Sequence, residues 1–407
     1  MRSRIDPARF VPQLLAPIGA LLLAAAISSV ALVASGKSPL TAFSQMLDYG
    51  VQPDSIVSIL DHATPYYLAA VAVAVGFRMN LFNIGVDGQY RLAALLSAAL
   101  GAASFLGWLP GVLRTVLIVL VAMVVGAAWA GVAGVLKVTR GVSEVIATIM
   151  LNTIAGGLAA YLLTTDRLAV QPKGSNIVST PLLRPDSWVP GLPLVGGADD
   201  VNGFLVVAVV VGAVYWFLLG RTRFGFDLRA SGLNPSAAVA SGVDARRMVV
   251  YTMLLSGGLA GLVGMPQLLG ESHAYTSDFG GLGFTGIGIA LLGRNHPVGI
   301  GFASVLWAFL DRSAQILDLE EIPKEIVTIM QGTTVLAVVV AYEVASRVGR
   351  RAQQRRVGAA VAEPPPPEPV LTGAPGAPRP PGTPGAPGAG GGSGAGRSGT
   401  ADREERP

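Results

Sequence analysis

Residues 112–136, VLRTVLIVLVAMVVGAAWAGVAGVL, decide the fold class of this 407-residue chain. Arg114 is the only charged residue in this stretch, and the other positions are apolar, small or hydroxyl-bearing. A helix that crosses the hydrocarbon layer of a membrane needs about 20 consecutive, mostly apolar residues. The stretch is long enough to do so, and it therefore predicts a membrane-spanning helix.

Comparable apolar windows recur along most of the chain, at 13–34, 55–77, 85–106, 142–163, 203–220, 248–270, 297–312 and 327–346. A cleaved signal peptide is the alternative for the first window, but its apolar stretch is too long for one and further spans follow. The stretch 281–293 is short and glycine-rich, so 281–312 forms either two full crossings or two half-helices. Counting both as crossings gives about ten transmembrane helices, and the sequence predicts an all-α, polytopic membrane protein.

The composition agrees with this fold class. Hydrophobic residues make up 51% of the chain and charged residues only 13%, whereas soluble domains carry about 25% charged residues. So few charges cannot cover a soluble globule of this length. The absence of cysteine excludes disulfide frameworks, Cys-ligated zinc and thiol nucleophiles.

The C-terminal part of the chain has a different composition. Residues 364–387, PPPPEPVLTGAPGAPRPPGTPGAP, are too rich in proline and glycine to build a packed core. We therefore predict two parts: a transmembrane domain over 1–352 and a disordered Pro/Gly-rich cytoplasmic tail over 353–407.

The basic residues predict the topology, because lysine and arginine are enriched in short cytoplasmic loops. With the N-terminus inside, the inner segments hold Arg2, Arg4, Arg9, Arg78, Arg91, Lys137, Arg140, Arg221, Arg223, Arg229, Arg246, Arg247, Arg294, Arg347, Arg350, Arg351, Arg355 and Arg356. The outer segments hold Lys37, Arg114, Arg167, Lys173, Arg184 and Lys324. This asymmetry predicts a multi-pass protein of the plasma or inner membrane with both termini in the cytoplasm. The net charge of +4 is then a topology signal, and no nucleic-acid partner is needed to explain it.

Motifs of enzymes and metal sites are not found in the sequence. The run Gly36-Lys37-Ser38 resembles the end of a phosphate-binding loop, but alanine stands where that motif needs its first glycine. The three histidines, His62, His273 and His296, lack the spacing of metal ligands. We expect no catalytic residue, no metal site and no ATP site in this chain.

Polar residues inside or beside apolar windows are candidates for a translocation path, because irregular backbone at membrane depth must be buried in protein or line a cavity. The segment 77–91, FRMNLFNIGVDGQYR, is the most informative, and a capped connection between two helices is its alternative. Other polar groups follow in later windows, where ionisable and polar side chains usually point inward. The candidate path residues are Asn80, Asn83, Gln89, Asn152 and Gln267.

The inner loop 221–247, RTRFGFDLRASGLNPSAAVASGVDARR, predicts a short helix beside the membrane. Pro235 suits the first position of a helix, and Gly242 would stop it. A docking helix for a cytoplasmic partner fits this pattern, and a plain surface helix is the alternative. Farther along, Gly257 and Gly261 are four residues apart, a spacing that lets two helix backbones approach closely.

Four strings, in this order and spacing, resemble one protein family. They are FNIGVDGQ (82–89), GVSEVIATIMLN (141–152), LRASGLNPSAAVASGV (228–243) and GFTGIGIALLGRNHPVGI (283–300). The chain is similar over about 70–350 to the permease family of bacterial ABC importers for simple sugars and branched-chain amino acids. Within that family it most resembles the nucleoside-type branch.

The resemblance implies a type II importer-like permease that carries nucleosides or a related small polar solute into the cell. It implies three protein partners: a cytoplasmic ATPase subunit that holds ATP and Mg, a second homologous permease and an extracellular substrate-binding lipoprotein. This chain itself would need no cofactor and would contact membrane lipid. The family's ATPase-coupling loop corresponds here to Asn234, Pro235, Ala237, Ala238 and Gly242.

Two alternatives remain open at this point. Ribose-like sugars or branched-chain amino acids are alternative substrates for a permease of this family. An ion-coupled secondary transporter is the alternative from another class, and it would use Asp87, Glu144 or the Asp311–Arg312 pair as its coupling site.

Overall fold

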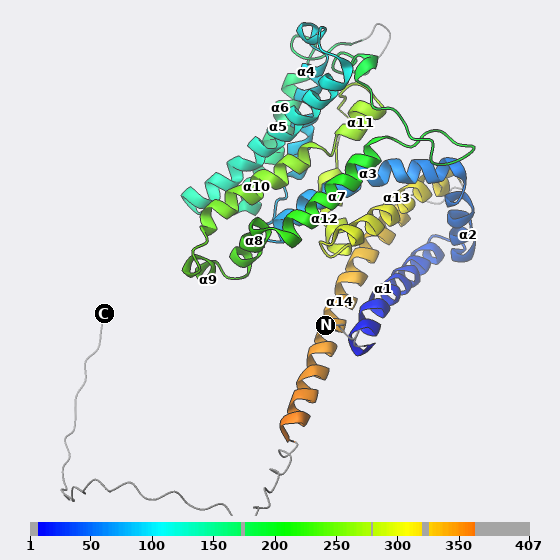
Figure 1. The fold of residues 1–407 in the computed structure, drawn as a ribbon. Coiled ribbons are helices and arrows are strands. Elements are labelled where there is room, and N and C mark those ends of the chain that lie inside the picture. Colours follow the sequence, from blue (N-terminus) through cyan, green and yellow to red (C-terminus); the bar gives the residue numbers. More distant parts are fainter. Residues whose placement is uncertain (1–6, 172–175, 278–279, 320–324, 363–407) are drawn as a thin grey trace, which may run out of the picture. The chain divides into compact units, whose positions relative to one another are not determined.

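The computed structural model describes residues 7–171, 176–277, 280–319 and 325–362. Within these ranges the α-helices, shown in Figure 1, are α1 (Pro7–Ala34), α2 (Pro39–Gly50), α3 (Pro53–Phe77), α4 (Val86–Gly101), α5 (Gly111–Arg140), α6 (Glu144–Leu162), α7 (Phe204–Arg221), α8 (Arg223–Leu233), α9 (Pro235–Ala240), α10 (Ala245–Gly261), α11 (Met265–Gly270), α12 (Leu282–Leu292), α13 (Pro297–Leu319) and α14 (Glu325–Ala362). Two short 3-10 helices, η1 (Ser104–Leu106) and η2 (Pro185–Ser187), lie in the connections. The described residues contain isolated β-bridges but no strand, so the all-α prediction is confirmed.

The ten predicted apolar windows all fall on helices: α1, α3, α4, α5, α6, α7, α10 with α11, α12, α13 and α14. Among the described residues, five helices are long and apolar enough to cross a membrane, namely α3, α5, α6, α7 and the segment Ala245–Gly270. A sixth candidate is the pair Leu22–Ala34 and α2, if the two are counted as one span bent by 117°. The polytopic character predicted from the sequence is therefore confirmed.

The segment 281–312 folds into two helices of unequal length. Helix α12 has 11 residues and at 1.5 Å per residue is about 16 Å long, roughly half of the hydrocarbon thickness of about 30 Å. Helix α13 has 23 residues, but it is not among the described helices that are apolar enough to cross by composition. How this segment crosses the membrane stays a prediction.

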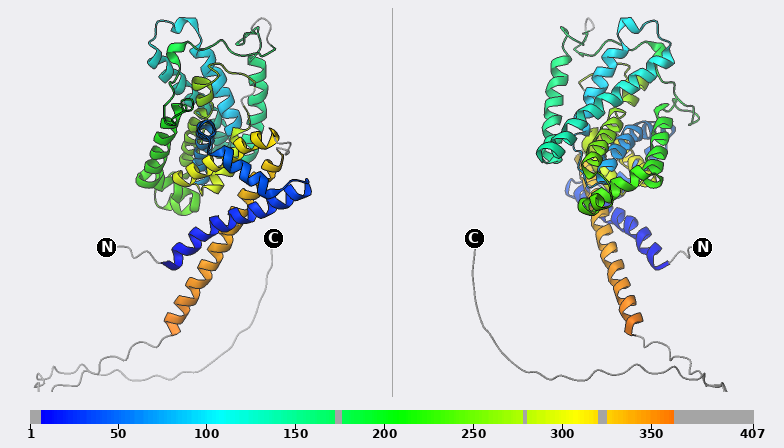
Figure 2. Two further views of the ribbon diagram at one scale, coloured as in Figure 1. Left: turned by 90° about the vertical axis from the view of Figure 1, so that its right-hand side faces the viewer. Right: turned by 60° about the vertical axis from the view of Figure 1, so that its left-hand side comes forward.

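Helix α3 lies at the centre of the helical body. Every residue from Leu68 to Gly76 is buried, whichever way its side chain points. A helix that is apolar on all sides is stable only when other helices surround it. Helices α7, α10, α12 and α13 contact α3 and provide that surrounding (Figure 2).

Helices α5 and α10 run side by side along their lengths (Figure 1). A Cβ added to Gly257 would clash with the Gly126 carbonyl oxygen, and one added to Gly261 would clash with the Ala122 carbonyl oxygen. The predicted close approach through Gly257 and Gly261 is therefore confirmed, and α5 is the helix they approach. The close-packed part ends at Gly261, and Pro266 lies in the first turn of α11.

The connection between α6 and α7 is held down at several points, although it has little regular structure. Arg114 of α5 is fully buried and donates to the Asp186 carboxylate at 2.7 Å and to the Leu109 carbonyl at 2.6 Å. The Trp188 ring stacks on the His273 ring with centroids 3.7 Å apart. The Arg114 contact fixes the loop against α5, and the ring stack fixes it against the segment that follows α11.

The helix α14 continues to Ala362, past the predicted domain boundary at 352/353. The rest of the predicted tail, 363–407, lies outside the described residues. The division into a transmembrane domain and a disordered tail stays a prediction.

Candidate functional site

A polar turn between α3 and α4 is the first candidate site. After α3 ends, the backbone folds back so that the Leu81 N–H donates to the Gly76 carbonyl at 3.0 Å. A Cβ at position 76 would lie 2.8 Å from the Leu81 oxygen, which explains the glycine. Asn80 has φ of +54°, a left-handed conformation that asparagine adopts more readily than most residues. We call residues 78–91 the hub, because side chains from several other elements converge on them.

Two buried amides form the core of the hub. Asn83 donates to Gln89 Oε1 at 2.9 Å, and Gln89 donates back to Asn83 Oδ1 at 2.8 Å. Asn83 also donates to the Ser256 hydroxyl of α10 at 2.9 Å and accepts the Gly85 N–H at 3.1 Å. All four hydrogen-bonding positions of the Asn83 amide are thus used, and both side chains are 1% exposed.

Asn152 joins helix α6 to the hub. Its Oδ1 accepts the Gly88 N–H at 2.9 Å, and its Nδ2 donates to the Ile84 carbonyl at 2.8 Å. A Cβ on Gly88 would lie 2.8 Å from the Ala155 Cβ, so glycine is what allows α4 and α6 to approach here. The half-buried Asn152 amide therefore satisfies backbone groups at the start of α4.

Asp87 joins the hub to the half-length helix α12. Its Oδ1 accepts the backbone N–H of Gly281 at 2.9 Å, and its Oδ2 pairs with Arg91 Nε at 2.9 Å. The first amides of a helix lack partners within the helix and favour a negative charge, so a carboxylate here stabilises the start of α12. Asp87 is 7% exposed, and Arg91 compensates its buried charge.

Arg78 connects the other end of the hub to the tight turn between α12 and α13. Its Nη2 donates to the Asn295 carbonyl at 2.6 Å, and the Tyr215 hydroxyl of α7 donates to the same carbonyl at 2.8 Å. Arg294 and Asn295 both have positive φ, so this turn holds two non-glycine residues in the left-handed region. The hub thus has contacts on α6, α7, α10, α12 and the turn before α13.

The predicted path residues therefore have defined places. Asn83, Gln89 and Asn152 meet in the hub, where the buried Asn83 amide has no hydrogen-bonding position left for a passing solute. The role of these residues in a translocation path stays a prediction. Gln267 lies apart in α11, half-buried, with its backbone carbonyl accepting the N–H of Ser272 at 2.8 Å.

The coupling segment, residues 223–244, is the second candidate site. Asn234 caps α9 by accepting the Ala237 N–H at 3.0 Å, and Pro235 occupies the first turn. At the other end Gly242 has φ of +85°, with the Gly242 N–H bonded to the Val239 carbonyl and the Val243 N–H bonded to the Ala238 carbonyl. This is the Schellman arrangement that ends helices at a glycine, so the predicted helix and its boundaries are confirmed.

The residues of α9 differ in exposure. Ala238 is 3% exposed and faces its own chain, whereas Val239 is 59% exposed and Leu233, just before α9, is 85% exposed. Ala237 is also exposed. A partner would therefore meet Leu233, Ala237 and Val239, while Ala238 holds α9 against the body of the protein.

One contact joins the two candidate sites directly. The exposed Asn80 side chain donates through Nδ2 to the Gly232 carbonyl of α8 at 2.7 Å. A Cβ on Gly232 would lie 2.6 Å from the Met79 Cα, so the two backbones touch. The arginine pattern assigned both segments to the inner side, and their contact agrees with that relative assignment.

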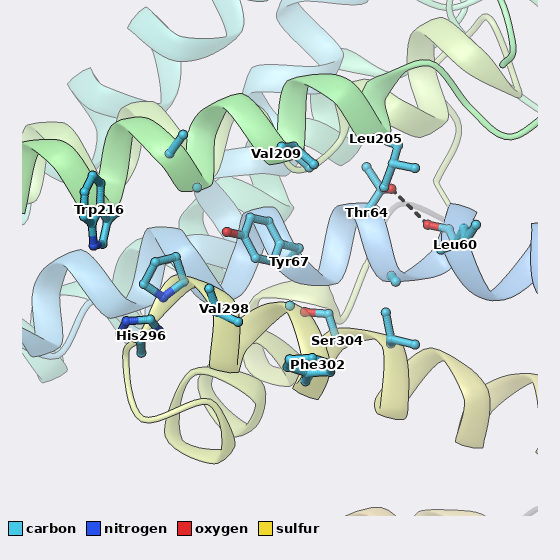
Figure 3. Close-up of a pocket in the computed structure, with 17 residues that line it drawn as sticks. Leu60, Thr64, Tyr67, Leu205, Val209, Trp216, His296, Val298, Phe302 and Ser304 are labelled. Atoms are coloured by element: carbon cyan, nitrogen blue, oxygen red, sulfur yellow. Dashed lines mark hydrogen bonds between the residues drawn. The ribbon is translucent and has the colours of Figure 1, made fainter. Parts of the chain in front are cut away.

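A groove between α3, α7 and α13 has a cavity volume of about 640 Å³. Figure 3 shows Tyr67 at its centre, with Val209, Trp216, Val298 and Phe302 around it. The walls are almost entirely apolar, and the Thr64 hydroxyl is turned back onto the Leu60 carbonyl at 2.9 Å. These walls fit hydrocarbon better than the hydroxyl groups of a polar solute. No cluster of three or more metal-ligating side chains occurs in the described part of the chain.

Three residues that bond within the hub or to it were not selected from the sequence as site residues. Asp87 was considered only as an ion-coupling candidate, Arg78 only as a charge that indicates topology, and Ser256 of α10 was not a candidate. Asp87 had a usable signal, because a carboxylate in an apolar window with arginine four residues later predicts a buried ion pair. Ser256 had none, since its partner lies 173 residues away.

Comparisons with known proteins agree on one family. Residues 55–339 match the family described as "Branched-chain amino acid transport system / permease component". The chain is 32% identical over 83% of its length, and 96% of the relative, to the "Guanosine ABC transporter permease protein NupP" of Bacillus subtilis. It is 30% identical over 81% of its length, and 92% of the relative, to the "Nucleoside ABC transporter permease protein NupB" of Lactococcus lactis. It is 32% identical over 82% of its length, and 90% of the relative, to the "Glucose ABC transporter permease protein TsgB13" of Haloferax volcanii. No solved structure matches the chain.

Proposed function

Because this chain belongs to the family of permease components of branched-chain amino acid transport systems, we propose that it is the permease subunit of an ATP-driven importer of nucleosides. The observation that carries the substrate class is the similarity over nearly the whole length of a guanosine and a nucleoside permease. The similarity includes the coupling segment and the hub, which both lie between residues 55 and 339.

In this proposal, ATP hydrolysis and solute passage belong to different subunits. ATP and Mg would bind to a separate cytoplasmic ATPase, which would dock on the exposed face of α9 formed by Ala237, Val239 and the preceding Leu233. The arginines that flank α9 in sequence favour a cytoplasmic position for this face, as they favour cytoplasmic positions for both termini.

Two more partners belong to the proposal. A second, homologous permease would complete the passage, as the resemblance to this family of ABC importer permeases implies. A substrate-binding lipoprotein would deliver the solute to the opposite side. The connection between α6 and α7 supports this part of the proposal, since Arg114 and the Trp188–His273 stack hold it in one shape.

The test of the substrate class is uptake in cells that lack the gene for this chain and in the same cells complemented with it. We expect complementation to restore uptake of labelled guanosine and other nucleosides. An excess of unlabelled nucleoside should suppress that uptake, and an excess of glucose should not.

Sugar import is the second candidate function, and the glucose permease relative is the observation that favours it. The same experiment separates the two. Restored uptake of glucose, with nucleoside uptake unchanged, would reject nucleosides and support the sugar.

A further inference from the structure

We propose that Asn80 and Gly232 form a rigid joint through which movement of the coupling segment is transmitted to the hub, with Asn80 as its positioning residue. The inference rests on the proposed function, in which an ATPase moves α9. It adds the route by which that movement reaches the membrane helices.

The joint is a backbone contact between the coupling segment and the helical body, beside the contacts of α8 and α9 with α7 and α10. Asn234 ends α8 and caps α9 with an extended backbone, φ −154° and ψ 98°, so the chain bends sharply at this residue. Gly232 lies two positions before the bend and touches the backbone of Met79. A displacement of α9 therefore pushes or pulls on the hub through a backbone contact, which cannot yield as a flexible side chain would.

The bond from Asn80 is not required by burial. Asn80 is exposed, so water could satisfy its amide if the Gly232 carbonyl moved away. The left-handed conformation of Asn80, φ +54°, belongs to the turn that ends α3, in which the Asn80 N–H bonds to the Phe77 carbonyl and the Leu81 N–H to the Gly76 carbonyl. From this turn the Asn80 amide reaches the Gly232 carbonyl, and because an exposed hydrogen bond adds little to stability, the contact points to a role in positioning.

The hub is able to carry the movement onward. Asn83 is bonded to Ser256 of α10, Asp87 to Gly281 of α12, and Arg78 to the carbonyl of Asn295 before α13. Asn152 adds helix α6. A shift of the hub would thus be shared by helices that are far apart in the sequence.

The experiment compares two variants in the complex with its ATPase and binding protein. Asn80→Asp keeps the size and backbone preference of the side chain but cannot donate, and it faces the Gly232 oxygen with a carboxylate. Gly232→Ala adds a Cβ that forces Met79 away. Gly220→Ala is the matched control, since a Cβ there meets nothing within 4 Å. The readouts are ATPase co-purification, ATP hydrolysis and solute imported per ATP hydrolysed.

We expect both variants to co-purify with the ATPase and to hydrolyse ATP like the wild type, with import per ATP reduced about tenfold. Gly220→Ala should match the wild type in every readout. Unchanged import per ATP in both variants would overturn the joint and leave the proposed function standing. Failure of the wild-type chain to bind any ATPase would overturn the proposed function, and the joint with it.

A cross-link keeps the proposal falsifiable if a variant does not fold. The chain has no cysteine, so cysteines introduced at the exposed positions Phe82 and Leu233 can be joined by a bifunctional reagent. If the joint is rigid, the cross-linked protein should import as well as the same variant before cross-linking. Loss of import on cross-linking would show that α8 slides over the hub, which contradicts the proposal.

Discussion

The carboxylate of Asp87 accepts a hydrogen bond from the backbone N–H of Gly281 at 2.9 Å and so ties the start of α4 to the start of α12. The Gly281 N–H at the start of α12 has no partner within the helix, so the carboxylate supplies one and its negative charge stabilises the helix start. The same carboxylate pairs with Arg91, so one buried side chain positions a half-length helix and binds a half-buried cation that compensates its charge.

Replacing Asp87 with asparagine should therefore weaken this junction. The amide side chain would keep one acceptor but lose the charge that Arg91 needs, and we expect a loss of about 1.5–3 kcal/mol in the free energy of unfolding. Thermal unfolding of the purified protein in detergent measures it. Asp54→Asn, at an exposed position in the first turn of α3, is the control and should leave the transition unchanged.

The α5–α10 interface predicts a sharp difference between two neighbouring glycines. Gly261→Ala would drive a Cβ into the Ala122 carbonyl, and we expect it to cost about 1–3 kcal/mol. Gly258→Ala should cost little, because its Cβ would lie 3.7 Å from the Met123 oxygen, an ordinary contact. Equal unfolding temperatures for the two variants would contradict the packing described for these helices.

Two neighbouring residues of α9 should separate binding of the ATPase from the stability of this chain. Val239→Arg changes an exposed side chain, so it should leave thermal unfolding unchanged but lower co-purification with the ATPase at least about tenfold, or 1.4 kcal/mol. Ala238→Arg should instead lower the unfolding temperature, because position 238 is buried against its own chain. If Val239→Arg binds the ATPase normally, this face of α9 is not the docking surface.

The connection between α6 and α7 should loosen as the pH falls. Burial lowers the pKa of His273 from its ordinary value near 6.5, and Nδ1 is buried without a hydrogen-bond partner in the described structure. The neutral His273 ring therefore stabilises the stack on Trp188 at pH values above the ordinary pKa near 6.5. This stabilisation is lost as the pH falls through the lowered pKa of the folded protein, where the ring becomes charged. After correction for the intrinsic rate, backbone amide hydrogen exchange of residues 176–202 should be faster at pH 5 than at pH 8.

His273→Phe keeps an aromatic ring on Trp188 and removes the titrating group. The loop of that variant should exchange equally at both pH values. His62→Phe, at an exposed position, should retain the pH dependence of the wild type. A wild-type loop whose corrected exchange does not change with pH would reject this role for His273.

The apolar windows predicted most of the fold. A segment that crosses lipid must satisfy its backbone hydrogen bonds internally, so it is helical, and it must present about 20 apolar residues to the hydrocarbon, so it is recognisable in the sequence. The capping residues of α9 were also readable, since Asn234, Pro235 and Gly242 act on neighbours within a few positions. Likewise, Gly257 and Gly261 predicted a close helix contact, though not that α5 would be the partner.

The functional geometry was harder to predict. A polar residue in an apolar window can face a path or bond to another buried group, and the sequence does not show which. Asn83 faces Gln89 and Ser256, and Ser256 is 173 residues away. Ala238 shows the same limit on a smaller scale, because its small size suits docking to a partner and packing on its own chain equally well.

We expect this chain to import nucleosides by means of ATP that a partner subunit hydrolyses. The most direct measurement is entry of labelled guanosine into proteoliposomes that contain the complete complex, with and without ATP inside the compartment that the coupling segment faces. Guanosine should accumulate against a gradient only when ATP and Mg are present, and this accumulation should be lost in Val239→Arg. Import at the same rate without ATP, driven by an ion gradient, would contradict it.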